Sequence, residues 1–221
     1  MNDLTATPNA RPYHHGNLRE AMVQSALALL EADGPGELSL RRAARDIGVS
    51  QTAPLYHFGN KLGLLVAVAI EGFHLLVALR KERIASASTA EERLRTAMLA
   101  YVEFGIAHPA LFRLMLGPEV RNKVRDAGLE EAAGEAFGML SDCVSAYLHQ
   151  HGLTSADDIQ RATLAAWATN HGIVTLLLDR QDSPLVASRR PPQDVAEGIV
   201  DVLIAGLGAM GTTEPKRGFS R

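Results

Sequence analysis

The chain has 221 residues, a formal net charge of −3 at pH 7 and a hydrophobic fraction of 47%. This apolar content is enough for a sizeable core in one or two domains, and it excludes a solvated, disordered chain. A single cysteine, Cys143, excludes an internal disulfide and favours a reducing cytoplasm. The N-terminal residues lack the apolar segment of a signal peptide, and the longest apolar run, 64–70, is too short to span a bilayer.

Helical periodicity covers nearly the whole chain, without strand-like alternation of useful length. Residues with capping side chains mark the expected helix starts in the first third of the chain: Asn17, Ser39, Ser50 and Asn60. The first of these helices is expected to end at the Gly-Pro-Gly turn of residues 34–36. The next two are short, and the helix after Asn60 is expected to run to about Ile84.

The remaining helices are expected to form a larger bundle. Their predicted starts are a capping box of Ser88 and Glu91, and later Thr154 with Asp157. The predicted helices span residues 88–108, 110–116, 119–150, 154–180 and 192–210, with a loop at 181–191. The helix breaks follow from Pro109 and from the Gly-Pro pair at 117–118, and Pro192 suits the first turn of the last helix.

Positive charge is concentrated in residues 39–61. This segment holds Arg41, Arg42, Arg45 and Lys61 against Asp46 alone, a net charge of +3 in a chain whose total is −3. Local basic density on a mildly acidic chain indicates a small element that contacts nucleic acid, carried on a larger body.

The same segment has the pattern of a helix-turn-helix, in which two short helices are joined by a tight turn. Gly48 permits the left-handed backbone that such a turn requires. Gln51 and Thr52 are expected in the first turn of the second helix, where Gln suits adenine and Thr contacts a base or a thymine methyl. With Ser50 as the cap, Pro54 becomes the fourth helical residue and removes only the first intrahelical hydrogen bond.

Residues 17–65 resemble the N-terminal domain of the TetR family of transcriptional regulators. The segments that carry the resemblance are NLREAMVQSALALLEADG, LSLRRAARDIGVS, and the HF and NK pairs before LGLL. The family usually has tyrosine where Leu55 stands, and Tyr56 is the candidate replacement for that phosphate contact. The predicted DNA-binding residues are Ser39, Arg41, Arg42, Gln51, Thr52, Tyr56, His57 and Lys61. The resemblance implies base reading by Arg41, Gln51 and Thr52, and backbone contacts by Ser39, His57 and Lys61.

The second half resembles the C-terminal domain of a TetR subgroup named for a Trp-His-Gly pattern, present here as Trp167 and His171-Gly172. The segments concerned are YVEFGIAHPALFRLML (101–116) and WATNHGIVTLL (167–177). The resemblance implies a small-molecule site in the helical body and a dimer built on the last two helices. Small residues beside aliphatic ones on these helices also favour close helix packing, either between two copies or within one chain.

The predicted pocket residues are bulky side chains that can contact a ligand: Phe104, His108, Phe112, Met115, Phe137, Tyr147, Trp167 and His171. The alternative is that they form plain core.

The motifs of common enzyme and metal sites are absent from the sequence, so we predict no enzymatic activity, no cofactor and no metal. The histidine pairs 14–15 and 149/151 lack a clear third ligand. Cys143 is either a redox sensor or a small core residue.

Together these features predict an all-α fold of about nine helices. The predicted parts are a flexible arm (1–15), a three-helix bundle with the helix-turn-helix (16–62), a ligand-binding and dimerisation domain (63–211) and a tail (212–221). The predicted function is that of a cytoplasmic, homodimeric repressor without membrane association. A small-molecule effector of unknown identity would release it from a palindromic operator in double-stranded DNA. The alternative is a ligand-binding or protein-interaction module with weak or vestigial DNA binding.

Overall fold

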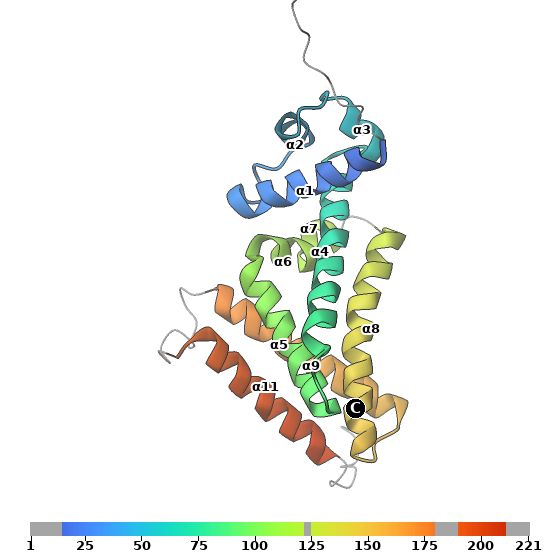
Figure 1. The fold of residues 1–221 in the computed structure, drawn as a ribbon, viewed down its shortest axis with the longest axis vertical. Coiled ribbons are helices and arrows are strands. Elements are labelled where there is room, and N and C mark those ends of the chain that lie inside the picture. Colours follow the sequence, from blue (N-terminus) through green and yellow to red (C-terminus); the bar gives the residue numbers. More distant parts are fainter. Residues whose placement is uncertain (1–14, 122–124, 180–189, 211–221) are drawn as a thin grey trace, which may run out of the picture. The chain divides into compact units, whose positions relative to one another are not determined.

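The computed structural model describes residues 15–121, 125–179 and 190–210, and this described part is entirely helical (Figure 1). It contains nine helices of six or more residues and a four-residue helix, α7, so the predicted all-α fold is confirmed. The chain divides into two compact units, residues 1–64 and 65–221.

The N-terminal unit consists of α1 (His15–Asp33), α2 (Leu40–Asp46), α3 (Ala53–Phe58) and the beginning of α4 (Lys61–Ile84). Its core consists of fully buried apolar side chains from α1, α2 and the segments beside them: Met22, Ala26, Leu30, Leu38, Ala43, Ala44 and Leu64. The buried Ser25 hydroxyl donates to the carboxylate of Asp46 at 2.7 Å and so ties α1 to the end of α2. The unit thus depends on a small apolar core and one polar link between helices.

The capping residues predicted at two of these helices are confirmed. The Ser39 hydroxyl accepts from the backbone N–H of Arg42 at 3.2 Å, and the Asn60 side chain accepts from that of Gly63 at 3.0 Å. The first helix begins at His15, two residues before the predicted start at Asn17. It ends where predicted, with Gly34 at a φ of 79°.

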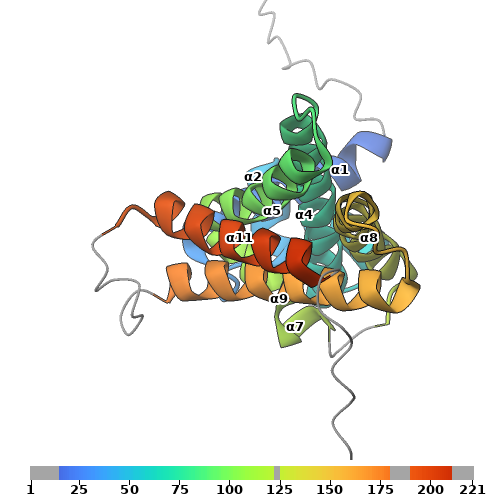
Figure 2. The same ribbon diagram turned by 90° about the horizontal axis from the view of Figure 1, so that it is seen from below.

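The C-terminal unit contains the rest of α4, followed by α5 (Ala90–Ala107), α6 (Pro109–Leu116), α7 (Pro118–Arg121), α8 (Ala127–Gln150), α9 (Ala156–Leu178) and α11 (Pro192–Ala209). Helix α5 packs against α8, α9 and α11, and α9 and α11 lie side by side (Figure 2). Helix α4 and the bent pair of α5 and α6 are long and apolar enough to cross a bilayer. Buried core helices have the same composition, however, and 56% of the apolar window of α4 is buried.

Three predicted helix starts in this unit are wrong. The predicted helix 119–150 is interrupted, because the Asp126 side chain caps α8 by accepting from the Leu129 N–H at 2.9 Å. The capping box lies one residue later than predicted, at Thr89 and Glu92. Helix α9 begins after Ser155, whose side chain makes no capping bond, rather than at Thr154, and it ends at Leu178. Of the predicted loop at 181–191, all but the last two residues lie outside the described residues.

Replacing either of two helical glycines of this unit by alanine is expected to change the stability of the chain, in opposite directions. A Cβ at Gly138 in α8 meets no atom within 4 Å, whereas one at Gly105 in α5 would collide with both methyl groups of Val174. Gly138→Ala is therefore expected to stabilise the chain by about 1 kcal/mol through helix propensity and unfolded-state entropy. Gly105→Ala is expected to destabilise it, because Val174 is buried and cannot move freely. Thermal unfolding of both variants checks this, and equal shifts would contradict it.

Candidate functional site

The turn between α2 and α3 has the geometry of a helix-turn-helix. After α2, Gly48 has a φ of 73°, a left-handed conformation that favours glycine. The Val49 N–H donates to the Ala44 carbonyl at 3.0 Å, and the Gly48 N–H to the Arg45 carbonyl at 3.2 Å. This pair of bonds is the Schellman motif, which ends one helix and redirects the chain towards the next.

Helix α3 begins later than the sequence indicated. Its first residue is Ala53, so Pro54 is the second helical residue rather than the fourth, and the predicted start after Ser50 is wrong. Ser50 still contributes at this end, because its hydroxyl accepts from the Ala53 N–H at 3.3 Å. A proline at the second position removes no intrahelical hydrogen bond, since the first N–H groups of a helix have no partner within it. Gln51 and Thr52 consequently lie in the turn before α3, not in its first turn.

Several predicted DNA-contacting side chains are exposed, and among them the Thr52 hydroxyl lies within hydrogen-bond distance, 3.3 Å, of the Ser50 hydroxyl. Gln51 and Thr52 are exposed immediately before α3, and Tyr56 on α3 is 91% exposed. Arg41 on α2 is exposed, and within the described residues it has no ion-pair partner. These groups offer a guanidinium, an amide, a hydroxyl and a phenol, which are the donors and acceptors used to contact bases and phosphates.

Other predicted DNA-contacting residues have bonds within the N-terminal unit. The Arg42 guanidinium pairs with Asp33 at 2.5 Å and with Glu37 at 3.4 Å. The Lys61 ammonium donates to the backbone carbonyls of Pro35 and Gly36, at 2.9 and 3.5 Å, and Ser39 caps α2. His57 is half-buried, with ring contacts to its neighbours Tyr56 and Phe58. The fold therefore uses these side chains before any contact with DNA.

One exposed cation was missed as an individual candidate. Arg45, in the last turn of α2, is exposed, and it makes no ion pair within the part of the chain described here. Its position three residues before Gly48 could have identified it, because the turn of the motif leaves the end of the preceding helix accessible. Arg41 and Arg45 are therefore the two available guanidinium groups of α2.

The C-terminal unit contains a cavity of about 710 Å³ between α4, α6, α8 and α9. Its walls are mainly aromatic and aliphatic: Phe73, Met115, Leu116, Leu129, Ala133, Gly134, Phe137, Leu164 and Trp167, with Arg125, Asp126 and Glu130 as the charged residues. This volume suits a drug-sized molecule. Among the predicted pocket residues, Met115, Phe137 and Trp167 line it.

The other predicted pocket residues surround the cavity or lie elsewhere. The His171 ring stacks between Trp167 and Phe112, with centroids 5.6 and 5.7 Å away, and so forms the layer behind the wall. Phe104 is buried, and its ring lies 5.2 Å from that of His108, which ends α5. Tyr147 instead links α8 to α11, because its hydroxyl donates to the Ile204 carbonyl at 3.0 Å.

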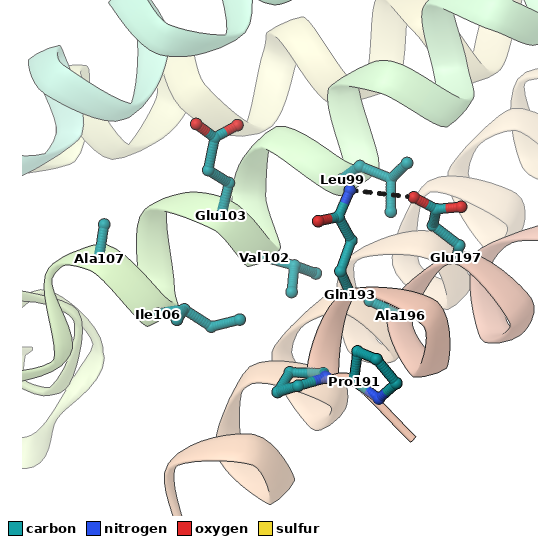
Figure 3. Close-up of a pocket in the computed structure, with 10 residues that line it drawn as sticks. Leu99, Val102, Glu103, Ile106, Ala107, Pro191, Gln193, Ala196 and Glu197 are labelled. Atoms are coloured by element: carbon teal, nitrogen blue, oxygen red, sulfur yellow. Dashed lines mark hydrogen bonds between the residues drawn. The ribbon is translucent and has the colours of Figure 1, made fainter.

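A second hollow, of about 690 Å³, lies between α5 and the start of α11 (Figure 3). Its floor is apolar, with Val102, Ile106 and Ala196, and its rim holds Glu103 and Glu197. Both carboxylates already accept hydrogen bonds from other side chains of the same unit. Arg83 binds Glu103 at 2.6 Å and lowers its pKa, while Glu197 accepts from Arg95 at 3.3 Å and from Gln193 at 3.2 Å. The cavity beside Trp167 is therefore the stronger candidate for a ligand.

Metal and redox chemistry receive no support from the described residues. Within them, no three His, Cys, Asp or Glu side chains gather as a metal site. His14, of the predicted weak histidine pairs, lies outside that part of the chain. Cys143 is buried, and this burial raises the pKa of its thiol, which disfavours the reactive thiolate.

Comparison with known proteins identifies the family of the chain. Residues 94–207 match the family of tetracyclin repressor-like C-terminal domains. Over 51 residues the chain is 47% identical to the tetracycline repressor protein class C of Escherichia coli, a match that spans 23% of each protein. The structure of a protein of unknown function from Rhodococcus sp. RHA1 is 33% identical, with a TM-score of 0.76, over 90% of this chain and all of that one.

A second solved structure has the same fold with less sequence identity. It is a regulatory protein of the tetR family from Rhodococcus RHA1, 20% identical, with a TM-score of 0.63, over 86% of this chain and 96% of its own. The Trp-His-Gly subgroup stays a prediction. The matched C-terminal domain covers more than half of the chain, and so the chain belongs to the TetR family of transcriptional regulators.

Proposed function

We propose that the protein is a cytoplasmic, homodimeric repressor that binds a palindromic operator in double-stranded DNA and leaves it when a small molecule binds the C-terminal unit. The observation that carries this proposal is a surface of exposed polar side chains at α2 and α3. Arg41, Gln51 and Tyr56 are exposed there on a motif whose turn and caps are complete without them. Exposed polar groups on a rigid scaffold suit direct contact with DNA.

A dimer supplies the second half of such a site. One helix-turn-helix reads only a few base pairs, whereas two copies related by a two-fold axis read successive major grooves about 34 Å apart. The surface that suits this dimer is the outer face of α9 and α11, where Leu176 and Val202 are exposed apolar residues. Exposed apolar patches of this kind indicate a protein–protein interface.

Effector release follows from the continuity of α4. This helix runs from Lys61 to Ile84, begins in the N-terminal unit and carries Phe73, a wall of the cavity, in the C-terminal one. A ligand that displaces α4 in both copies changes the spacing of the two reading heads. Coupling of this kind typically amounts to about 1–3 kcal/mol, or roughly five- to 150-fold in affinity.

Two substitutions test the DNA-reading face. Gln51→Ala is expected to cost about 1–3 kcal/mol on a duplex selected from a random-sequence pool, with little change on scrambled DNA, because base contacts carry specificity. Lys61→Ala is expected to weaken binding to both duplexes alike and to reduce the salt dependence by about two phosphate contacts, one from each copy of the dimer. Fluorescence anisotropy over a salt series measures both effects.

The same titrations separate this function from the alternative. Equal losses on both duplexes for Gln51→Ala would assign that residue to the DNA backbone. Wild-type protein that binds selected and scrambled DNA alike would favour a ligand-binding or protein-interaction module with vestigial DNA binding.

A further inference from the structure

Two hollows follow one another along the contact between α8 and α9. The first is the cavity of about 710 Å³ beside Trp167. The second has a volume of about 450 Å³ and is lined by Phe137, Ser141, Ala156, Asp157, Ile159, Gln160 and Thr163. Their walls are adjacent on both helices, because Phe137 is followed about one turn later by Ser141 on α8, and Thr163 adjoins the first cavity's Leu164 on α9. The two hollows are therefore sections of one groove.

The Phe137 side chain lies at the boundary between the two sections. Among the described lining residues it is the one that the two hollows share, and it is 39% exposed although it is apolar. At the far end of the second section the two helices approach each other, with the hydroxyls of Ser141 and Thr163 3.5 Å apart. The ring of Phe137 thus divides the groove, and a smaller side chain there would join its two sections.

The first section is elongated along α8. Its apolar wall follows one face of this helix from Leu129 to Phe137, eight residues further on, which corresponds to about 12 Å at 1.5 Å per residue. Phe73 of α4 and Met115 of α6 form a buried part of the same wall. This shape suits a ligand that is long rather than compact.

Charged groups are confined to one end of this section. Arg125, Asp126 and Glu130 lie at the beginning of α8, and Asp126 is used there as the helix cap. Among the other described lining residues, the indole N–H of Trp167 is the one side-chain N–H or O–H donor. A ligand with polar groups along its whole length, such as a sugar or a nucleoside, would leave most of them without hydrogen bonds. The section therefore suits an apolar chain with a single polar end.

We propose that the effector is a straight-chain amphiphile, and that Phe137 limits the length of chain that the cavity accepts. This inference rests on the proposed effector function of the cavity. The polar end of the ligand lies at the beginning of α8 beside Arg125 and Glu130, and its chain follows α8 to the ring of Phe137. A wall of about 12 Å matches an extended chain of roughly ten carbons. Each buried methylene raises the affinity about fourfold until the chain reaches this ring.

The test uses the fluorescence of the single tryptophan, Trp167, which lines the cavity. The full-length protein, without DNA, is titrated with straight-chain alkan-1-ols from hexan-1-ol to dodecan-1-ol. The affinity of the wild type is expected to rise about fourfold per methylene up to decan-1-ol, and by less than about twofold from there to dodecan-1-ol. Phe137→Ala is expected to continue the rise, by about 16-fold over the last two carbons, because the groove then extends about 6 Å further to Ser141. The same length limit in both proteins would overturn the inference.

Two glycines of α8 provide a matched pair of variants. A Cβ at Gly134 or at Gly138 meets no atom within 4 Å, but of the two only Gly134 is among the described residues that line the groove. Gly134→Leu is expected to move the length limit to roughly seven carbons, since Gly134 lies three residues before Phe137. Gly138→Leu is expected to leave the limit unchanged. Both variants replace a helical glycine by a better helix former, so both are expected to fold. An unchanged limit in Gly134→Leu, or an equal shift in both, would overturn the placement of the chain.

These titrations contain no DNA, so their failure does not affect the DNA-reading proposal. A wild-type protein that binds none of the alkan-1-ols would overturn the inference. Alkan-1-ols that bind with the expected length limit but leave operator affinity unchanged would support the site and refute its role as the effector site.

Discussion

Val202→Glu is expected to convert the proposed dimer into a monomer and to abolish operator binding at concentrations where the wild type is saturated. Val202 on α11 is 75% exposed in the single chain, and the proposed interface would bury it. An unpaired charge in such an interface costs about 3–5 kcal/mol, and a two-fold axis places it there twice. The dissociation constant of the dimer is therefore expected to rise by roughly a thousandfold or more. Sedimentation equilibrium measures it.

A matched control separates charge from loss of shape. Val202→Thr keeps the branched shape without a formal charge and is expected to remain dimeric. A Val202→Glu protein that sediments as a dimer would show that the outer face of α9 and α11 is not the interface.

Gly63→Ala is expected to unfold the N-terminal unit while the C-terminal unit stays folded. A Cβ at this position would collide with the backbone carbonyl oxygen of Phe58, at the junction between α3 and α4. A backbone atom cannot rotate away as a side chain does, so the cost is expected to be about 3 kcal/mol, at the upper end for overpacking. That is a large share of the stability of a unit of some 50 residues. Hydrogen exchange resolved by segment measures the loss.

Gly36→Ala is the control for this prediction. Gly36 lies in the same unit, and a Cβ there meets nothing within 4 Å. It is expected to leave both hydrogen exchange and DNA binding unchanged. Wild-type exchange rates in Gly63→Ala would contradict the proposed collision.

Local features of the sequence predicted the fold well where one residue decides a boundary. Ser39 and Asn60 cap helices through their own side chains, Pro109 begins α6, and Gly48 takes the left-handed conformation of the turn. The start of α8 was missed because residues 119–126 are compatible with a helix, and the Asp126 cap competes with that helix locally.

The site was less predictable, because contacts between distant residues decide which side chains are available. The three arginines of α2 have the same charge: Arg41, Arg42 and Arg45. Only the folded chain shows that Arg42 forms ion pairs with Asp33 and Glu37. Arg80 stands near the end of a long helix, and nothing in the neighbouring sequence indicates that it is buried. Its burial follows from the packing of α5 and α8 around it, which no local pattern contains.

The central claim is that a two-fold dimer reads a specific DNA sequence, and selection from fragmented genomic DNA tests it most directly. Purified wild-type protein and Gln51→Ala would each be mixed with the fragments, and the bound fragments sequenced. We expect a few sites for the wild type that share a near-palindrome, with half-sites about one helical turn apart, and an altered or lost motif for the variant. An even distribution of fragments for the wild type, or the same motif for both proteins, would contradict it.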